Sequence, residues 1–366
     1  GHMGTKRSYY CTYCFAGFSM RSGLLRHEKS CNTAQIIEMP DEHNKWLQYA
    51  NPGYTLLHPC YLVSDLECRL VSLPSQGNSK KPDQMHELLS FAIYPVVTDR
   101  YKHIFPDMLP YFYKAKSDSE DVKVTLCSTL NKMATEILKR IETYNPMSYV
   151  SDDEIKKCME KNVCLGCNRP LTEKPPFNDA KLPTSTKGPY HRHHDHLLPP
   201  DGDHSNFYGV LHKVCNALIR VPNKVICYYH NLSSYDGKFL IQGYCNSGEI
   251  PTVLMQSSEK VTQITTRKLV FKDSLAIFNA PLSKIASSMS SEHFILTKKL
   301  FKNNYELFIR KLPFPYGLLT SVESYDIPIS QIKQSDFDSD LISEMKCSDE
   351  DYQHFQKFAE VMKVQN

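Results

Sequence analysis

The sequence has no apolar run that approaches the roughly 18 residues needed to cross a bilayer, so we expect a soluble protein without a membrane partner. It has no signal peptide, so its 13 cysteines do not indicate a secreted disulfide scaffold. Nor is it strongly charged, and a formal net charge of +3 neither demands nor excludes a nucleic-acid partner. Because several cysteines instead stand with histidines at metal-ligand spacing, we predict a reducing intracellular setting, nuclear or cytoplasmic.

At 366 residues, with 41% hydrophobic and 23% charged residues, the chain has an ordinary globular composition and exceeds what one core usually holds. We therefore expect two or three cooperating units. Gly1, His2 and Met3 read as a cloning remnant, so the natural chain is expected to begin near Gly4.

Strand-like and helix-like patterns alternate along the chain, which favours a mixed α/β core. Apolar and β-branched stretches predict the strands, and apolar residues at helical spacing predict an amphipathic helix at 124–144. The polar stretch 75–82 predicts a loop. The predicted strands are residues 60–71, 90–97, 225–232 and 268–275, and the predicted helices are residues 124–144, 281–289 and 343–364.

Two acidic residues interrupt an apolar predicted strand. Asp65 and Glu67 are two positions apart, so the period of a strand projects both carboxylates from one face. Burying two like charges is costly without a cation, which indicates a metal site. The alternative is an edge strand whose two acids simply face water. Asp236 begins a predicted helix further along the chain. Taken alone, it could be no more than the cap of that helix.

A zinc-finger pattern, Cys-x2-Cys-x12-His-x3-Cys, stands near the N-terminus. Four such ligands can close a tetrahedral Zn²⁺ site, and a unit this small needs the metal to fold. Arg21, Arg26 and Lys29 could contact phosphates, but one finger gives little sequence specificity, so contact with a protein partner or docking on the core of this chain is equally plausible. The four ligands are Cys11, Cys14, His27 and Cys31.

A second Cys/His set lies in a segment rich in turn-forming residues. It predicts a second structural Zn²⁺ site. The histidines between its two halves are alternative ligands, although loop histidines are more often solvated. The predicted ligands are Cys164, Cys167, His212 and Cys215, and the alternatives are His191, His193, His194 and His204.

The order and spacing of several motifs are similar to the N-terminal part of protein-primed family B DNA polymerases of Polinton/Maverick-type mobile elements and related viruses. The resemblance covers about residues 59–285. Its motifs are HPCYLVSDLECRL, HELLSFAIYPVV, NPMSYVSDDE followed by CLGC, then HKVCN, YYHNLSSYDGKFLI and FKDSLAIFNAPLSKI.

This resemblance implies an RNase H-like mixed-sheet exonuclease fold, in which Asp65, Glu67 and Asp236 hold two Mg²⁺ or Mn²⁺ ions for 3'→5' hydrolysis of a single strand. Asn231 would position the strand. The Cys/His segment resembles an inserted endonuclease VII-type ββα-metal module, whose nuclease residues would be Asp195, His196 and Asn216. The implied domains are a C2HC finger at residues 4–35, a discontinuous exonuclease domain at 55–160 and 222–366, and the inserted zinc module at 161–221.

The sequence departs from the family pattern in three ways. The third exonuclease motif, a tyrosine four residues before an aspartate, is not found after Asp236, since Tyr149 and Asp153 precede it. Leu198 stands where the inserted module commonly has a second histidine. A polymerase palm is missing, because the SDFDSD stretch at residues 335–340 reads as a solvated turn.

Three hypotheses follow from these motifs and departures. The first is a two-metal 3'→5' exonuclease that acts on single-stranded DNA or RNA. The second is an inactive or weakened nucleic-acid- or protein-binding module derived from a mobile element. The third is an endonuclease that works through the inserted module.

Overall fold

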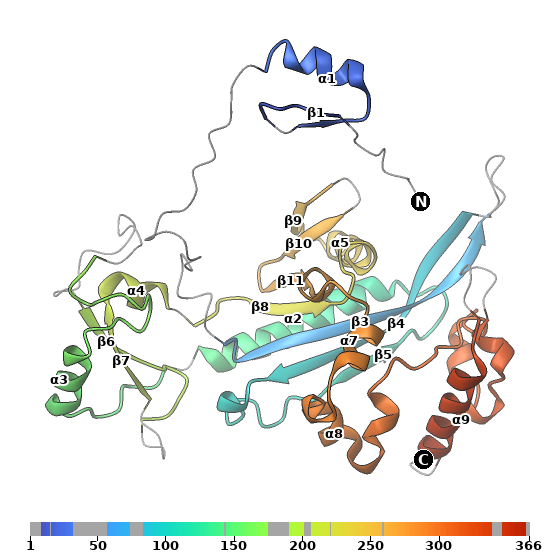
Figure 1. The fold of residues 1–366 in the computed structure, drawn as a ribbon. Coiled ribbons are helices and arrows are strands. Elements are labelled where there is room, and N and C mark those ends of the chain that lie inside the picture. The colour runs from blue at the N-terminus through green and yellow to red at the C-terminus, as the bar shows by residue number, and fades with distance from the viewer. Residues whose placement is uncertain are drawn as a thin grey trace. The chain divides into compact units, whose positions relative to one another are not determined.

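The computed structural model describes residues 9–14, 16–31, 57–73, 83–142, 144–174, 190–200, 206–219, 221–257, 260–338 and 346–363. The chain divides into two compact units, residues 1–50 and 51–366. In the first unit, β1 (Tyr9–Tyr10) pairs antiparallel with β2 (Gly17–Phe18), and α1 (Arg21–Glu28) follows (Figure 1). A short hairpin followed by one helix buries little apolar surface, so we expect this unit to need a metal ion bound by its Cys/His residues in order to fold.

The second unit is built on a seven-stranded mixed sheet with the order β5-β4-β3-β8-β11-β10-β9. Parallel pairing joins β3 to β8 and β8 to β11, and the other neighbours are antiparallel. The predicted mixed α/β class is confirmed. The strands are β3 (Cys60–Leu73), β4 (Asp83–Val97), β5 (Tyr111–Lys114), β8 (Val225–Tyr229), β9 (Thr252–Met255), β10 (Val261–Thr265) and β11 (Leu269–Asp273).

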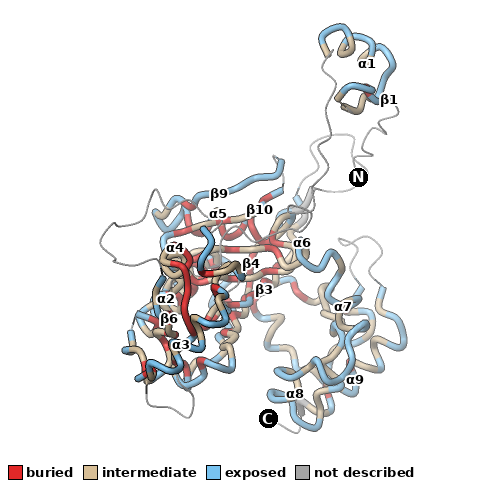
Figure 2. Tube along the Cα trace, turned by 60° about the vertical axis from the view of Figure 1, so that its left-hand side comes forward, coloured by how far each residue is buried: buried red, intermediate tan, exposed pale blue. Residues whose placement is uncertain are grey.

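Helices α2 (Val122–Ile141) and α5 (Asp236–Asn246) pack against each other, and α2 also packs on β4 and β8. On β3, Leu62, Ser64 and Leu66 are buried while Val63 and Asp65 between them are exposed. One face of the sheet is therefore covered, and the face that carries Val63 and Asp65 is open over β3. Figure 2 shows the buried residues concentrated in the sheet and in the helices that cover it.

The segment between α2 and β8 has a small core of its own. Helix α3 (Asp152–Glu160) precedes a hairpin of β6 (Tyr190–His194) and β7 (Phe207–His212), which continues into α4 (Lys213–Leu218). A separate hydrophobic cluster forms here from Cys164, Leu171, Val210, Leu211 and Cys215.

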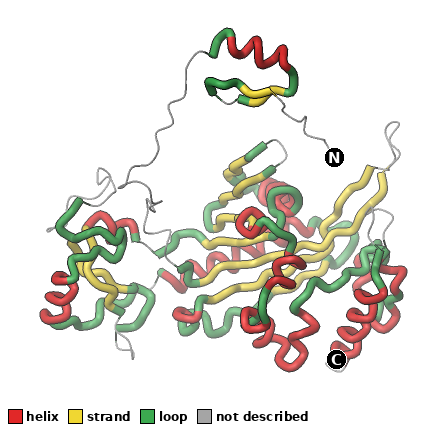
Figure 3. Tube along the Cα trace, in the orientation of Figure 1, coloured by secondary structure: helices red, strands yellow, loops and turns green. Residues whose placement is uncertain are grey.

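After β11 the chain is mainly helical, with short helices joined by loops (Figure 3). These helices are α6 (Ser274–Phe278), α7 (Leu282–Ser288), α8 (Ile295–Phe301) and α9 (Asp349–Lys363). The 3-10 helices are η2 (Asp99–Tyr101), η3 (Ser291–His293), η4 (Lys302–Phe308), η5 (Val322–Asp326), η6 (Ile329–Gln331) and η7 (Gln334–Phe337). Within the described ranges, we find no helix with the length and apolar character of a membrane span.

The predicted elements mostly recur with shifted bounds, and the second predicted helix begins at 282 rather than 281. The predicted loop at 75–82 lies outside the described residues, as do positions 339 and 340 of the SDFDSD stretch. The prediction of a solvated turn is wrong for residues 335–337, because they belong to η7 and Phe337 is buried in a hydrophobic cluster. Strands β5, β9 and β10 were not predicted from the sequence.

Candidate functional site

Two carboxylates project from the open face of β3. Asp65 is exposed and Glu67 is half-buried, and both alternate with residues that face the core. The edge-strand alternative is wrong, because β3 lies between β4 and β8 in the sheet. A central strand that presents two acids from one face is an unusual arrangement, which calls for a partner of opposite charge.

Asp236 follows the loop after β8, and its carboxylate interacts electrostatically with those of Asp65 and Glu67. It begins α5 and is only 4% exposed. Burial, and after it the charge of Asp65, raises the pKa of Asp236 to about 7. Asp273 and Glu67 add to this repulsion. The ionised form of Asp236 is therefore disfavoured unless a cation approaches.

The other two carboxylates are perturbed in the same direction. Burial, followed by the charge of Asp65, raises the pKa of Glu67 to about 7. Asp65 reaches solvent, yet the surrounding protein displaces enough water to raise its pKa as well. Among the described residues, only the two Cys/His sets bring three or more candidate ligand atoms within 4.8 Å of one another, so the three carboxylates are coupled without being in ligand contact.

Two residues from the C-terminal half act on the acidic pair, and neither was predicted from the sequence as a site residue. The phenol of Tyr316 donates a 3.2 Å hydrogen bond to Oε2 of Glu67. The positive charge of Lys311 acts on both Asp65 and Glu67 and lowers their pKa values, against the larger effect of burial. No local sequence pattern marks either residue, because the contact between Tyr316 and Glu67 spans 249 positions of the chain.

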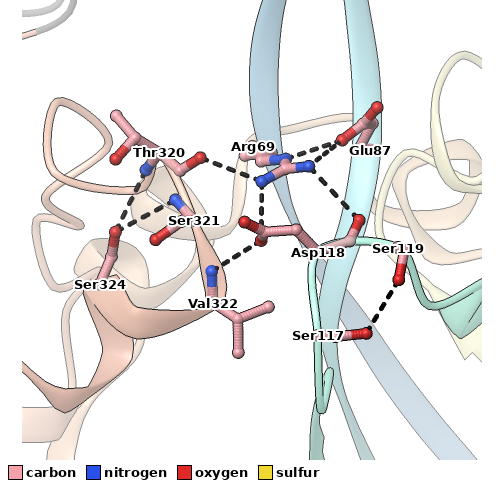
Figure 4. Close-up of polar contacts among 9 residues, drawn as sticks. All are labelled: Arg69, Glu87, Ser117, Asp118, Ser119, Thr320, Ser321, Val322 and Ser324. Carbon is pink, nitrogen blue, oxygen red and sulfur yellow. Dashed lines mark hydrogen bonds and ion pairs between the residues drawn. The ribbon is translucent and has the colours of Figure 1, made fainter.

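An arginine on β3 anchors the segment that carries Tyr316. The Arg69 guanidinium forms ion pairs of 2.6 Å with Glu87 and 2.7 Å with Asp118, and it donates to the carbonyl of Thr320 at 3.1 Å. Asp118 also accepts from the backbone N–H of Val322 at 2.9 Å (Figure 4). The arginine side chain is only 13% exposed, so these contacts fix the segment against β3 and β4.

The loop that leads to Asp236 is held by Asp273. The carboxylate accepts 2.9 Å hydrogen bonds from the backbone N–H groups of Asn231 and Ser233, and one from Leu275 caps α6. Burial alone would raise the pKa of Asp273, but these hydrogen bonds hold it below its usual value. Asn231 has a φ of 79°, a left-handed conformation that asparagine adopts more readily than most residues. Asp273 therefore positions the loop and stays ionised.

In the first unit, the four predicted zinc ligands form one set whose ligand atoms all lie within 4.8 Å of one another. Cys14 Sγ lies 3.1 Å from Nε2 of His27, and Phe18 packs against the His27 ring at a centroid distance of 5.0 Å. This set could hold a zinc ion in a tetrahedral site. Its members are Cys11, Cys14, His27 and Cys31.

The second predicted ligand set also comes together, within the same 4.8 Å limit. Nδ1 of His212 faces the sulfurs of Cys167 at 3.4 Å and Cys215 at 3.8 Å, while its Nε2 lies 3.1 Å from the carbonyl of Pro170. A hydrogen bond from Cys215 lowers the pKa of Cys164 to about 4, so thiolate character is favoured. The four ligands are Cys164, Cys167, His212 and Cys215.

The nuclease residues expected in this module lie in two places. Asp195 is buried and accepts a 2.9 Å hydrogen bond from the Tyr101 hydroxyl. It also forms an ion pair of 3.2 Å with Arg100. Asn216 instead faces His193, with 2.8 Å between Oδ1 and Nδ1. The carboxylate of Asp195 therefore attaches the module to residues 100 and 101.

The remaining histidines of this segment are spread around the hairpin. The His196 ring stacks on His194 at 4.4 Å, and Nε2 of His194 lies 3.1 Å from the carbonyl of Asn145. Leu198 packs against the main hydrophobic core. The alternative ligand His204 lies outside the described residues.

Comparison with known proteins returned no match for this chain, whether to a family model, to a curated protein or to a solved structure. Within the described residues, the candidate sites are two Cys/His sets and a coupled acidic centre at the open face of the sheet.

Proposed function

We propose that the second unit is a divalent-metal nuclease of the 3'→5' exonuclease type, acting on single-stranded DNA or RNA. The observation that carries this proposal is the coupling of Asp65, Glu67 and Asp236, two of which have pKa values raised to about 7 by burial and mutual repulsion. A divalent cation would relieve that repulsion, and oxygen ligands suit Mg²⁺ and Mn²⁺.

The sheet topology supports an RNase H-like fold. Strands β3, β4 and β5 form an antiparallel meander, and the first of them pairs in parallel with β8, which pairs in parallel with β11. Helix α2 precedes β8 and α5 follows it, as an RNase H-like arrangement requires. Together with the ordered motifs, this topology also supports descent from the polymerases of mobile elements.

The residues of the centre divide into metal ligands and residues that position the ligands or the strand. When bound, divalent ions polarise a water molecule and stabilise the leaving oxygen of the phosphodiester. Asp65, Glu67 and Asp236 would hold these ions. Tyr316 fixes the orientation of the Glu67 carboxylate through its hydrogen bond. Asn231, whose backbone is held by Asp273, would orient the strand.

A second candidate function is strand binding without cleavage. The observation that favours it is Thr320, which stands four residues after Tyr316 where the family pattern has a metal-binding aspartate. A hydroxyl is a much weaker ligand for Mg²⁺ than a carboxylate, so a site with three acids would cleave slowly or not at all. This candidate predicts binding with a steep salt dependence and no cleavage in any divalent metal.

An endonuclease centre in the zinc module is the third candidate. The hairpin of β6 and β7 followed by α4 has the order of a ββα-metal unit, and His193 faces Asn216 across it. Nicking of duplex or branched DNA that disappears in His193→Ala or His196→Ala would support this candidate over the other two.

Digestion of end-labelled single strands tests the first proposal. Zinc-loaded protein is incubated with labelled DNA or RNA, with and without Mn²⁺, and the products are resolved by length. Shortening from the 3' end that is lost in Asp65→Ala supports the proposal, and Asp153→Ala, which alters an exposed acid on α3, is the matched control. Digestion that survives in Asp65→Ala rejects it.

A further inference from the structure

A cavity of about 440 Å³ lies beside the acidic pair on the open face of the sheet. Asp65 and Glu67 line one side of it, and Phe112 and Lys114 of β5 line another. A volume of this size is within the range of small-molecule sites, which starts near roughly 300 Å³. The cavity is therefore large enough for one nucleotide.

The register of three strands explains why the surface is hollow here. Asp65 pairs with Ala92, which pairs with Phe112 across β5. In the next row, Glu67 pairs with Ser90, which pairs with Lys114. In these two rows the middle strand contributes only the small side chains of Ala92 and Ser90 between the acids and the β5 residues. Two interstrand spacings, roughly 10 Å, separate the two sides.

Aromatic residues from the C-terminal half complete the wall. Phe314 and Tyr325 line the cavity, and the Tyr325 hydroxyl lies 2.7 Å from Oγ of Ser90. The ring of Phe314 packs against Tyr316 at a centroid distance of 4.8 Å, and Tyr316 in turn bonds to Glu67. The wall is therefore continuous from the carboxylates to the aromatic side.

From this arrangement we propose that the cavity binds the terminal nucleotide of a single strand, with the base against Phe112 and the phosphate toward Asp65 and Glu67. This inference rests on the proposed nuclease function and adds the residue that holds the base. Phe112 is 76% exposed and lines the cavity, so its ring is accessible to a base that enters the cavity.

The chemistry of the walls favours a nucleotide over an apolar peptide side chain. One side carries two acids suited to a metal-bound phosphate, while the other presents a flat ring on which any base can stack. The hydroxyl groups of Ser90 and Tyr325 lie between them. Lys114 is paired with Asp326 at 2.7 Å, so the phosphate is expected on the β3 side.

Fluorescence of a DNA 12-mer with 2-aminopurine at its 3' end tests the pocket. The oligonucleotide also carries a 5' label that reports affinity, and readings are taken in Ca²⁺ before any cleavage product appears on a gel. In the wild type, stacking on Phe112 is expected to quench the 2-aminopurine. Phe112→Ala should abolish the quench and weaken binding by roughly 5- to 150-fold, the range of one lost base–aromatic stack. Phe112→Trp should restore both.

Phe278→Ala is the matched control, because this phenylalanine of α6 is 61% exposed and does not line the cavity. An unchanged quench and affinity in Phe112→Ala would overturn the pocket, as would failure of the wild type to bind the oligonucleotide. If the cavity binds a protein segment instead of a nucleic-acid strand, the wild type will fail to bind the oligonucleotide. Quenching without any cleavage would support binding of the nucleotide in the cavity and contradict the proposed nuclease activity. Cleavage that depends on Asp65 but not on Phe112 would keep hydrolysis and reject the pocket.

Discussion

Tyr316 donates a hydrogen bond to Glu67 across 249 positions of sequence, and this contact joins the C-terminal half of the chain to the acidic centre on β3. A phenol that donates to a carboxylate stabilises the ionised form and lowers the pKa of the acid. Here that effect opposes burial and the charge of Asp65, which together raise the pKa of Glu67 to about 7. The contact therefore tunes the charge of the centre and fixes the orientation of one proposed ligand.

Tyr316→Phe should raise the pKa of Glu67 further. Loss of a hydrogen bond to a charged group corresponds to an upward shift of about one unit. Carbon-13 NMR of the Glu67 carboxyl across a pH titration measures the shift directly. An unchanged or lower pKa would show that the phenol does not stabilise the carboxylate in solution.

Asp236→Asn should stabilise the protein at high pH more than at low pH. The folded pKa of Asp236 is raised to about 7, above the unfolded value near roughly 3.9, so the native state binds this proton more tightly. Ionisation therefore lowers the free energy of unfolding as the pH rises from about 4 to about 7. Asparagine removes that loss, and urea unfolding of zinc-loaded protein should show a gain about 2–3 kcal/mol larger at pH 8 than at pH 5. The same gain at both pH values would contradict this account.

Arg69→Ala should lower the free energy of unfolding by about 2–4 kcal/mol, because it leaves Glu87 and Asp118 without their cation and releases the carbonyl of Thr320. Arg310→Ala is the control. Its ion pairs with Glu350 and Asp351 involve an arginine that is 39% exposed, so its loss should cost less than about 1 kcal/mol. Equal losses in urea unfolding would show that the Arg69 cluster is no more than a surface network.

Cys164→Ser should reduce the bound zinc from two ions per chain to one and loosen the module alone. The buried cluster around Cys164 and Cys215 is separate from the main core, so the seven-stranded sheet should persist. Zinc content and limited proteolysis measure the two effects. Retention of both ions, or cleavage within the sheet, would contradict the assigned ligand set.

Local spacing was enough to predict the Cys/His sets and the shared face of Asp65 and Glu67. Ligand spacing and the period of a strand are properties of a few consecutive residues, so they can be seen in sequence. The central strands were predicted for the same reason, since buried strands are apolar throughout or along one face.

Contacts between distant segments could not be predicted in this way. Tyr316 and Lys311 reach the acidic pair from far along the chain, and no periodicity marks them. Strand β5 is only four residues long, so its three aromatic residues are too short a run to identify a strand. In the zinc module, the family resemblance grouped Asp195 and His196 with Asn216, whereas the structure places His193 against Asn216.

The central claim is that Asp65, Glu67 and Asp236 act together on a divalent cation. The most direct measurement is a Mn²⁺ titration followed by electron paramagnetic resonance, on protein whose two Cys/His sites are already filled with zinc. We predict Mn²⁺ binding at pH 8 that is lost in Asp65→Asn and in Asp236→Asn but kept in Asp153→Asn. Binding that is unaffected by the first two substitutions, or absent from the wild type, would contradict it.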